Sequence, residues 1–257
     1  NIISAFAADK VLFNSKFHFN DFMTAASRLI KQMPDFRPGW MIEQIRQKTE
    51  VVYPGCRFET GVINLKERDV KAPLIIWNHR WEYDKNPEFF FDALSALKEK
   101  NIPFSLALLG EKYDIFPDIF KKAKEKFKKE IFVYGYVESR NEYVNWLEKG
   151  AIVVSCAIQE NFGISVVEAV RFGCIPLLPD RLSYPEIMPA EFHSKVLYQT
   201  KEAMLEKLTD MLVNYQELLP LQKKLSENME VFSWEIIVKQ YDENEYPRNQ
   251  PINKTCT

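Results

Sequence analysis

Two glutamates, Glu160 and Glu168, lie eight residues apart on either side of Gly163, the only glycine in a stretch of more than twenty residues. Carboxylates accept hydrogen bonds from hydroxyl groups, and a glycine lets the backbone approach a ligand closely. A helix that begins near Gly163 would offer free N–H groups, with the positive end of its dipole, to a phosphate. These N–H groups would belong to Phe162, Gly163 and Ile164. The segment therefore predicts a phosphate site between two acceptors of hydroxyl groups.

The same two glutamates also have an ordinary structural interpretation. On a helical wheel, Glu168 falls opposite the apolar face of this helix and three residues before Arg171, so the two side chains would form a surface ion pair. Glu160 would then be an acid placed favourably for the helix dipole. Spacing by itself leaves both interpretations open.

A pair of cations, Arg80 and Lys85, lies five residues apart in a second candidate loop. A forked guanidinium and a compact ammonium group together suit a diphosphate. The alternative is that both are solvated loop charges that pair with Glu82 or Asp84.

The elements that must position these residues follow from an alternation of apolar runs and helical periods, which is typical of a parallel sheet in an α/β fold. The runs predict strands over residues 74–77, 104–109, 131–134, 152–155, 175–178 and 195–198. The periods predict helices over about 87–100, 115–129, 139–148, 163–172 and 201–213, with Asn86, Ser139 and Gly173 as capping residues.

Ligands bind at the carboxyl ends of the strands in open α/β sheets. Arg80 and Lys85 follow the first predicted strand, and Gly110 follows the second. Gly135 follows the third strand, and Glu160 lies in the loop after the fourth. We therefore expect four loops to meet at one rim.

The domain organisation is predicted from the same pattern. Residues 1–55 hold one strand (11–13) and two helical stretches, too little for a core of their own, and they resemble the closing part of a preceding domain. Residues 56–232, which open on a polar linker, form the complete doubly wound domain. A helix at 233–246 is expected to pack back on the first segment, and 247–257 to form a flexible tail.

Composition excludes several classes of protein. The formal net charge of −2 gives no global field for nucleic acid or an anionic membrane. The four cysteines and three histidines are too dispersed for a zinc site, and the apolar runs are too short to cross a bilayer. We expect a cytoplasmic protein with reduced thiols, no metal and no membrane partner.

Three stretches carry a resemblance to a known family. The segment ENFGISVVEAVRFGCIPLL resembles the E-x7-E signature of the retaining GT-B glycosyltransferases of the glycosyltransferase group 1 type. The segment from Arg80 to Lys85 resembles that family's diphosphate-binding loop, and residues 135–137 resemble its GYV turn. Within the family, SAFAADKVLFNSKFHFNDF, HRWEYDKNPEFFF and PDRLSYPEIMPAEF are most similar to the tRNA-queuosine α-mannosyltransferases.

The resemblance implies a role for each matching residue. Glu160, Arg80 and Lys85 would be the catalytic set, with Glu160 at the donor sugar hydroxyls and the two cations at the diphosphate. Glu168 would bind the ribose. The backbone of Phe162, Gly163 and Ile164 would approach phosphate and sugar, and the base would be bordered by Gly110, Gly135, Tyr136 and Val137.

Some family features have no counterpart here. The family's glycine-rich loop and its N-terminal-domain histidine are absent, and we do not assign His18, His79 or His193 to replace them. Residues 183–187 (SYPEI) are a weaker candidate for the acceptor side. The lysine-rich stretch 121–129 is better explained as a solvated helix face than as a tRNA site.

The resemblance therefore implies a GT-B fold that lacks most of its N-terminal half, and transfer of mannose from GDP-mannose to queuosine in tRNA(Asp), with retention and without a metal cofactor. The missing N-terminal segment would be needed to complete the cleft, so we expect this chain to bind a nucleotide sugar without turnover. Two alternatives stay open: a non-catalytic nucleotide-sugar-binding or interaction module, and a GT-B sugar-nucleotide epimerase.

Overall fold

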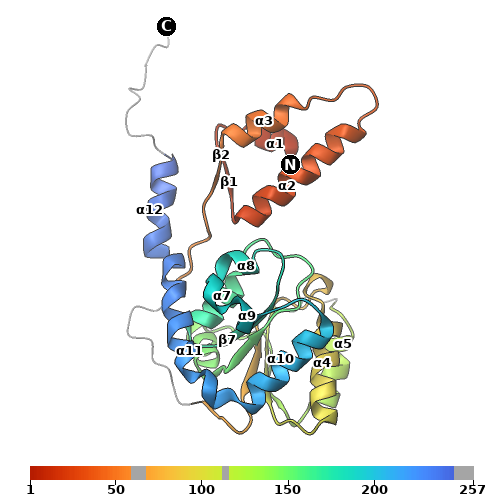
Figure 1. The fold of residues 1–257 in the computed structure, drawn as a ribbon, viewed down its shortest axis with the longest axis vertical. Coiled ribbons are helices and arrows are strands. Elements are labelled where there is room, and N and C mark those ends of the chain that lie inside the picture. Colours follow the sequence, from red (N-terminus) through yellow and green to blue (C-terminus); the bar gives the residue numbers. More distant parts are fainter. Residues whose placement is uncertain (59–67, 112–115, 246–257) are drawn as a thin grey trace.

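The computed structural model describes residues 1–58, 68–111 and 116–245. Two parallel sheets organise them, a small one of two strands and a large one of six. Figure 1 shows the small unit, coloured red to orange, beside the large domain. The small unit consists of α1 (Ile2–Ala7), β1 (Val11–Phe13), α2 (Lys16–Gln32), α3 (Trp40–Gln47) and β2 (Thr49–Val51).

The large sheet has the strand order β5-β4-β3-β6-β7-β8, and every neighbouring pair is parallel. Its strands are β3 (Leu74–Trp77), β4 (Ser105–Leu109), β5 (Ile131–Gly135), β6 (Ile152–Val154), β7 (Ile175–Pro179) and β8 (Leu197–Tyr198). The strand order reverses direction between β3 and β6, where a doubly wound sheet binds its ligands. The predicted fold class, a doubly wound parallel α/β domain with a smaller N-terminal part, is confirmed.

Helices connect the strands and cover both faces of the sheet. The longer ones are α4 (Pro87–Glu99), α5 (Ile119–Lys126), α6 (Arg140–Lys149), α7 (Ile164–Arg171), α10 (Lys201–Val213), α11 (Tyr215–Asn228) and α12 (Trp234–Glu245). The short ones are α8 (Tyr184–Ile187), α9 (His193–Val196) and the 3-10 turns η1 (Tyr83–Lys85), η2 (Ala190–Phe192) and η3 (Met229–Phe232). Helix α4 packs with α5 and α10, whereas α7 packs with α6 and α11.

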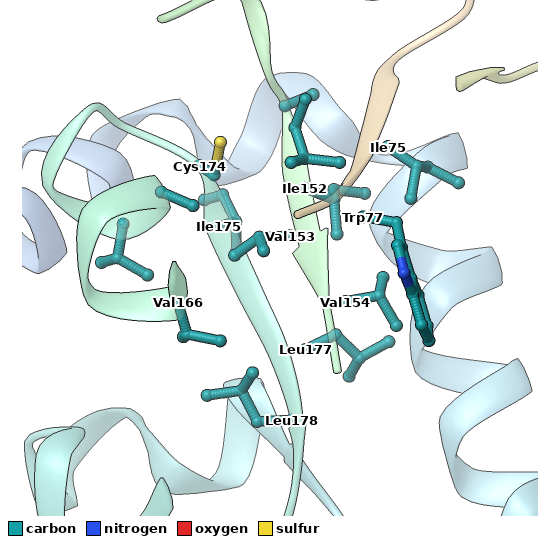
Figure 2. Close-up of a cluster of buried hydrophobic side chains, with 14 of the residues drawn as sticks. Ile75, Trp77, Ile152, Val153, Val154, Val166, Cys174, Ile175, Leu177 and Leu178 are labelled. Atoms are coloured by element: carbon teal, nitrogen blue, oxygen red, sulfur yellow. The ribbon is translucent and has the colours of Figure 1, made fainter. Parts of the chain in front are cut away.

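The centre of the sheet is the core of the domain. Ile75, Ile152 and Ile175 lie side by side on three adjacent strands and are completely buried. Figure 2 shows Val166 of α7 on one side of these strands and Trp77 on the other. Because strands covered on both faces must be apolar throughout, this core explains the continuous apolar runs of the sequence. It also fixes the first turn of α7 against the sheet.

Several predicted elements are wrong in detail. The predicted strand at 195–198 is strand only at its last two residues, because α9 takes up His193–Val196. The predicted helix at 115–129 is shorter, Ile119–Lys126, and residues 112–115 lie outside the described part of the chain. Asn86 does precede α4, but its backbone is left-handed (φ 53°) and its side chain makes no capping bond.

The other two capping predictions are confirmed. The hydroxyl of Ser139 accepts a hydrogen bond from the N–H of Glu142 at 3.4 Å. Gly173 follows α7 with a φ of 96°, and the N–H of Cys174 donates to the carbonyl of Ala169. Helix α7 therefore ends in the left-handed turn that favours glycine.

The segment between the two sheets is held at both of its described ends. Cys56 forms a β-bridge with Ser233, and the backbone of Trp234, the first residue of α12, donates to the carbonyl of Cys56 at 2.8 Å. Arg68 is buried and donates to the carbonyl of Phe172 at 2.9 Å. The start of α12 thus lies next to the end of the first segment, and the predicted tail beyond residue 246 lies outside the described residues.

Candidate nucleotide-sugar site

A cleft of about 800 Å³ lies at the carboxyl edge of the sheet, between the large domain and α2. Arg80, Lys85 and Glu160 all line it, together with the start of α7. The first segment contributes Asn14, Phe17 and Asp21 from the opposite side. The structure thus brings together residues that the sequence separates by more than a hundred positions.

Lys85 is the most buried cation of this cleft, with 9% of its side chain exposed. Its ammonium group lies 2.8 Å from Asp84 and 3.5 Å from Glu160, and it donates to the carbonyl of Gln159 at 3.0 Å. A buried charge needs such partners, because the protein interior replaces water poorly. The alternative pairing with Asp84 is therefore present, but Lys85 is not a solvated loop charge.

Arg80 differs from Lys85 in its exposure. Half of its side chain is exposed, and its guanidinium lies 3.2 Å from Glu82. An ion pair at such an exposed position contributes little, so a diphosphate could displace Glu82 at a small cost. The two cations therefore offer one fixed and one adaptable contact to an anion.

The loop before α7 has the conformation that the glycine suggests. Gly163 has a φ of 95°, and a Cβ added there would lie 3.1 Å from Cε1 of Tyr184. One oxygen of Glu160 accepts from the N–H groups of Asn161 and Phe162. Among the described residues we find no hydrogen-bond partner for the N–H groups of Gly163 and Ile164. These N–H groups, rather than that of Phe162, are therefore available as donors at this helix start.

Glu168 lies away from the 800 Å³ cleft and has different partners from those that the helical wheel suggested. It pairs with Arg140 of α6 at 2.7 Å and accepts from the hydroxyl of Tyr143 at 3.2 Å. Arg171, the expected partner, pairs instead with Glu230. The prediction of an i, i+3 surface pair is therefore wrong.

A second pocket, of about 280 Å³, lies at the start of α6, and Glu168 is not part of its lining. Gly110, Tyr136 and Val137 line it, as do Asn78, Arg140 and Tyr143. A Cβ added at Gly110 would clash with the carbonyl oxygen of His79 and, at 2.8 Å, with the ring of Trp81, so this position requires glycine. Gly135 ends β5 with a φ of 114° and turns the chain into the pocket wall.

His79 is buried and lines neither pocket. Its ring nitrogens lie 3.2 Å from the carbonyl of Val154 and 3.2 Å from the hydroxyl of Ser165. Burial lowers the pKa of His79 to about 4, against an opposing influence of Glu160. A neutral imidazole so placed connects β3, β6 and α7, as expected for a histidine that we did not assign to catalysis.

Several residues of the site were not predicted from the sequence. Asn78 follows β3 directly, so its position at a strand end was an available signal. Arg140 and Tyr143 occupy the first turn of α6, and only the packing of α6 against α7 brings them to Glu168. Asn14 and Phe17 reach the cleft because Ser15 donates from its hydroxyl to the carbonyl of Asn161 at 2.5 Å.

Two features of the described residues bear on cofactors and membranes. No three histidine, cysteine or acidic side chains gather as they would around a metal ion. None of the described helices is both long and apolar enough to cross a bilayer.

Comparisons with known proteins agree with this geometry. Residues 1–56 match the tRNA-queuosine alpha-mannosyltransferase N-terminal family. The chain is 38% identical over 215 residues to a tRNA-queuosine alpha-mannosyltransferase of Drosophila melanogaster, an alignment that covers 80% of this chain and 56% of that protein. The chain thus spans about half the length of this curated relative.

Solved structures show the fold. The structure is similar to TarM with a TM-score of 0.71 and 16% identity, over 95% of this chain and 44% of that chain. It is similar to the sucrose-phosphate synthase of Thermosynechococcus elongatus with a TM-score of 0.70 and 15% identity, over 94% and 59% of the two chains. Both comparisons span the small and the large sheet, as the GT-B fold requires. Since residues 64–231, most of the chain, match the glycosyl transferases group 1 family, the chain belongs to that family.

Proposed function

We propose that this chain forms the donor-binding part of a retaining hexosyltransferase that transfers mannose from GDP-mannose to queuosine in tRNA(Asp). The observation that carries the donor site is the position of Lys85, buried beside Glu160 at the start of α7. The relative from Drosophila melanogaster, named a tRNA-queuosine alpha-mannosyltransferase, supports the choice of sugar acceptor.

The donor would occupy both pockets. Its diphosphate would lie against Arg80, Lys85 and the N–H groups of Gly163 and Ile164 in the larger cleft, with the sugar near Glu160. Its nucleoside would extend past Glu168 into the pocket at Gly110 and Tyr136. The pockets lie at neighbouring positions on the rim, because Asn78 lines one and Arg80, two residues later, lines the other.

The chemistry assigned to these residues is electrostatic. When the bond between sugar and diphosphate breaks, negative charge develops on the departing nucleoside diphosphate. Arg80 and Lys85 would stabilise that charge, and each charge-assisted hydrogen bond contributes about 1.5–3 kcal/mol. Glu160 would hold the sugar hydroxyls and, as an anion, favour the positive charge that forms on the anomeric carbon. We propose no protein nucleophile and no metal.

Calorimetric titration tests the donor site. We expect GDP-mannose to bind the chain, and Lys85→Met to weaken binding at least about tenfold because one charged contact is lost. Lys201→Met is the matched control, since Lys201 pairs with Asp92 on an exposed surface outside both pockets. Absence of binding, or equal effects of the two substitutions, would refute the site.

The acceptor is tested separately in cells. Disruption of the gene should remove mannosyl-queuosine from tRNA(Asp), as measured by mass spectrometry of the digested nucleosides. An unchanged level of mannosyl-queuosine would contradict the proposed acceptor and leave the donor site to be judged by the titration.

A further inference from the structure

Glu168 is the end point of a chain of hydrogen bonds that starts at the edge of the sheet. The side-chain amide of Asn78 donates to the carbonyl of Ser165 at 2.8 Å and to the hydroxyl oxygen of Tyr143 at 2.9 Å. Tyr143 then donates to Glu168 at 3.2 Å. Asn78, in the loop after β3, and Tyr143 of α6 thus form a chain of hydrogen bonds that ends at the carboxylate of Glu168 in α7.

The chemistry of the groups fixes the direction of these bonds. A backbone carbonyl only accepts, so the group of Asn78 that faces Ser165 must be its NH₂. The same NH₂ donates its second hydrogen to Tyr143, whose single hydroxyl proton is then left for Glu168. Burial and the negative charge of Glu168 raise the pKa of Tyr143, so this hydroxyl keeps its proton. Tyr143 is therefore a permanent donor to the carboxylate.

Arg140 holds the other oxygen of the carboxylate. Its guanidinium lies 2.7 Å from Glu168, donates to the carbonyl of Arg57 at 2.9 Å and stacks over the ring of Tyr143 at 5.4 Å. Each oxygen of Glu168 thus has one fixed donor. An ionised carboxylate accepts about four hydrogen bonds, so these two donors leave about two acceptor positions, on a side chain that is 16% exposed.

We propose that Tyr143 is a positioning residue that holds Glu168 in the orientation in which its remaining lone pairs accept both ribose hydroxyls of a nucleoside diphosphate. The inference rests on the proposed function, because the donor must place its ribose at Glu168. Two adjacent ribose hydroxyls need two acceptor positions of fixed direction, which a freely rotating glutamate does not provide. Asn78 and Arg140 complete the arrangement by fixing Tyr143.

A purely structural role for Tyr143, as a link between α6 and α7, makes a different prediction. The loss of a structural link would weaken every ligand of the pocket to the same extent. The loss of a positioning residue would weaken only ligands with ribose hydroxyls. The two roles are therefore separated by a nucleotide that lacks these hydroxyls.

The experiment compares GDP with 2′,3′-dideoxy-GDP by calorimetric titration. We expect Tyr143→Phe to weaken GDP binding about tenfold, the effect of one hydrogen bond to a charged group, and to change dideoxy-GDP binding less than about twofold. Tyr134→Phe is the matched control, since Tyr134 is a half-buried tyrosine of β5 that lines neither pocket. It should change neither affinity.

A second variant guards against a general loss of structure. Arg140→Gln changes a side chain that is 40% exposed and should show the same selective loss of GDP affinity. If both variants bound the two nucleotides more weakly to the same extent, or if their affinity for GDP were unchanged, the positioning role of Tyr143 would be refuted. The proposed function would not be affected by that result. Failure of the unsubstituted chain to bind any nucleoside diphosphate would overturn the proposed function, and this inference with it.

Discussion

Three glycines of this chain allow two contributions to the energy of the turn before α7, backbone strain and steric contact, to be measured separately. Gly163 has a φ of 95° and a neighbour 3.1 Å from an added Cβ. Gly135 has a φ of 114° with nothing within 4 Å, and Gly39 has ordinary helical backbone (φ −58°) with nothing within 4 Å. Substitution of Gly163 by alanine therefore tests backbone strain together with a close contact. The same substitution at Gly135 tests backbone strain alone, and at Gly39 it tests neither.

The expected magnitudes follow from these geometries. A left-handed backbone costs an L-residue about 1–2 kcal/mol, which we expect for Gly135→Ala. Gly163→Ala should cost about 1 kcal/mol more, because Tyr184 is completely buried and cannot turn away. Its hydroxyl lies 2.6 Å from that of Ser155, which holds the ring in place. Gly39→Ala should stay within about 0.5 kcal/mol of the unsubstituted chain.

Thermal unfolding measures these differences. One kcal/mol shifts the Tm of a domain of this size by about 2–4 °C, so Gly163→Ala should lower the Tm by about 4–12 °C. The same variant should also bind GDP more weakly, because the N–H groups of Gly163 and Ile164 move with the backbone. If Gly163→Ala melted within a degree of Gly39→Ala, the account of this turn would be wrong.

Two further predictions concern stability. The pKa of His79 in the folded chain, about 4, lies below the ordinary value of 6.5, so the unfolded chain takes up a proton first as the pH falls. The free energy of unfolding should therefore decrease by up to about 3 kcal/mol between pH 6.5 and pH 4. His79→Gln should flatten this dependence in urea unfolding measured across that range, and an equally steep curve would contradict it. Glu186 accepts from the N–H of Phe17 at 3.0 Å and the hydroxyl of Tyr53 at 2.8 Å. Glu186→Gln should therefore lower the free energy of unfolding by about 2 kcal/mol in the same assay. Glu191 is exposed, so Glu191→Gln should leave it almost unchanged, and equal losses in the two variants would contradict the role of Glu186.

The strands were predictable because a sheet covered on both faces leaves little choice of residue. The runs at 74–77 and 131–134 match β3 and β5 to within a residue. Helix α11 was not predicted, because Pro220 lies inside it and a proline ordinarily argues against a helix at that position. The run at 195–198 misled because its apolar residues begin at Val196, although Val196 ends α9 and only Leu197 and Tyr198 pair with β7.

The rim of the site was predictable for a similar reason, since parallel strands deliver their loops to one edge. Arg80, Lys85 and Glu160 meet there as expected. The partner of Glu168 was not predictable, because helical spacing shows only neighbours on the same helix. Arg140 lies 28 residues earlier on another helix, and only the packing of α6 on α7 brings the two together.

The contact between α2 and the large domain has a consequence for the order of folding. Lys16 and Phe17 donate from the start of α2 to Glu186, a partner 170 and 169 residues further along the chain. Contacts of such high sequence separation form slowly, because a long loop must close first. During synthesis from the N-terminus, α2 is therefore made long before its partner leaves the ribosome. We expect the amide protons of Lys16 and Phe17 to gain protection from exchange only after the large domain has formed.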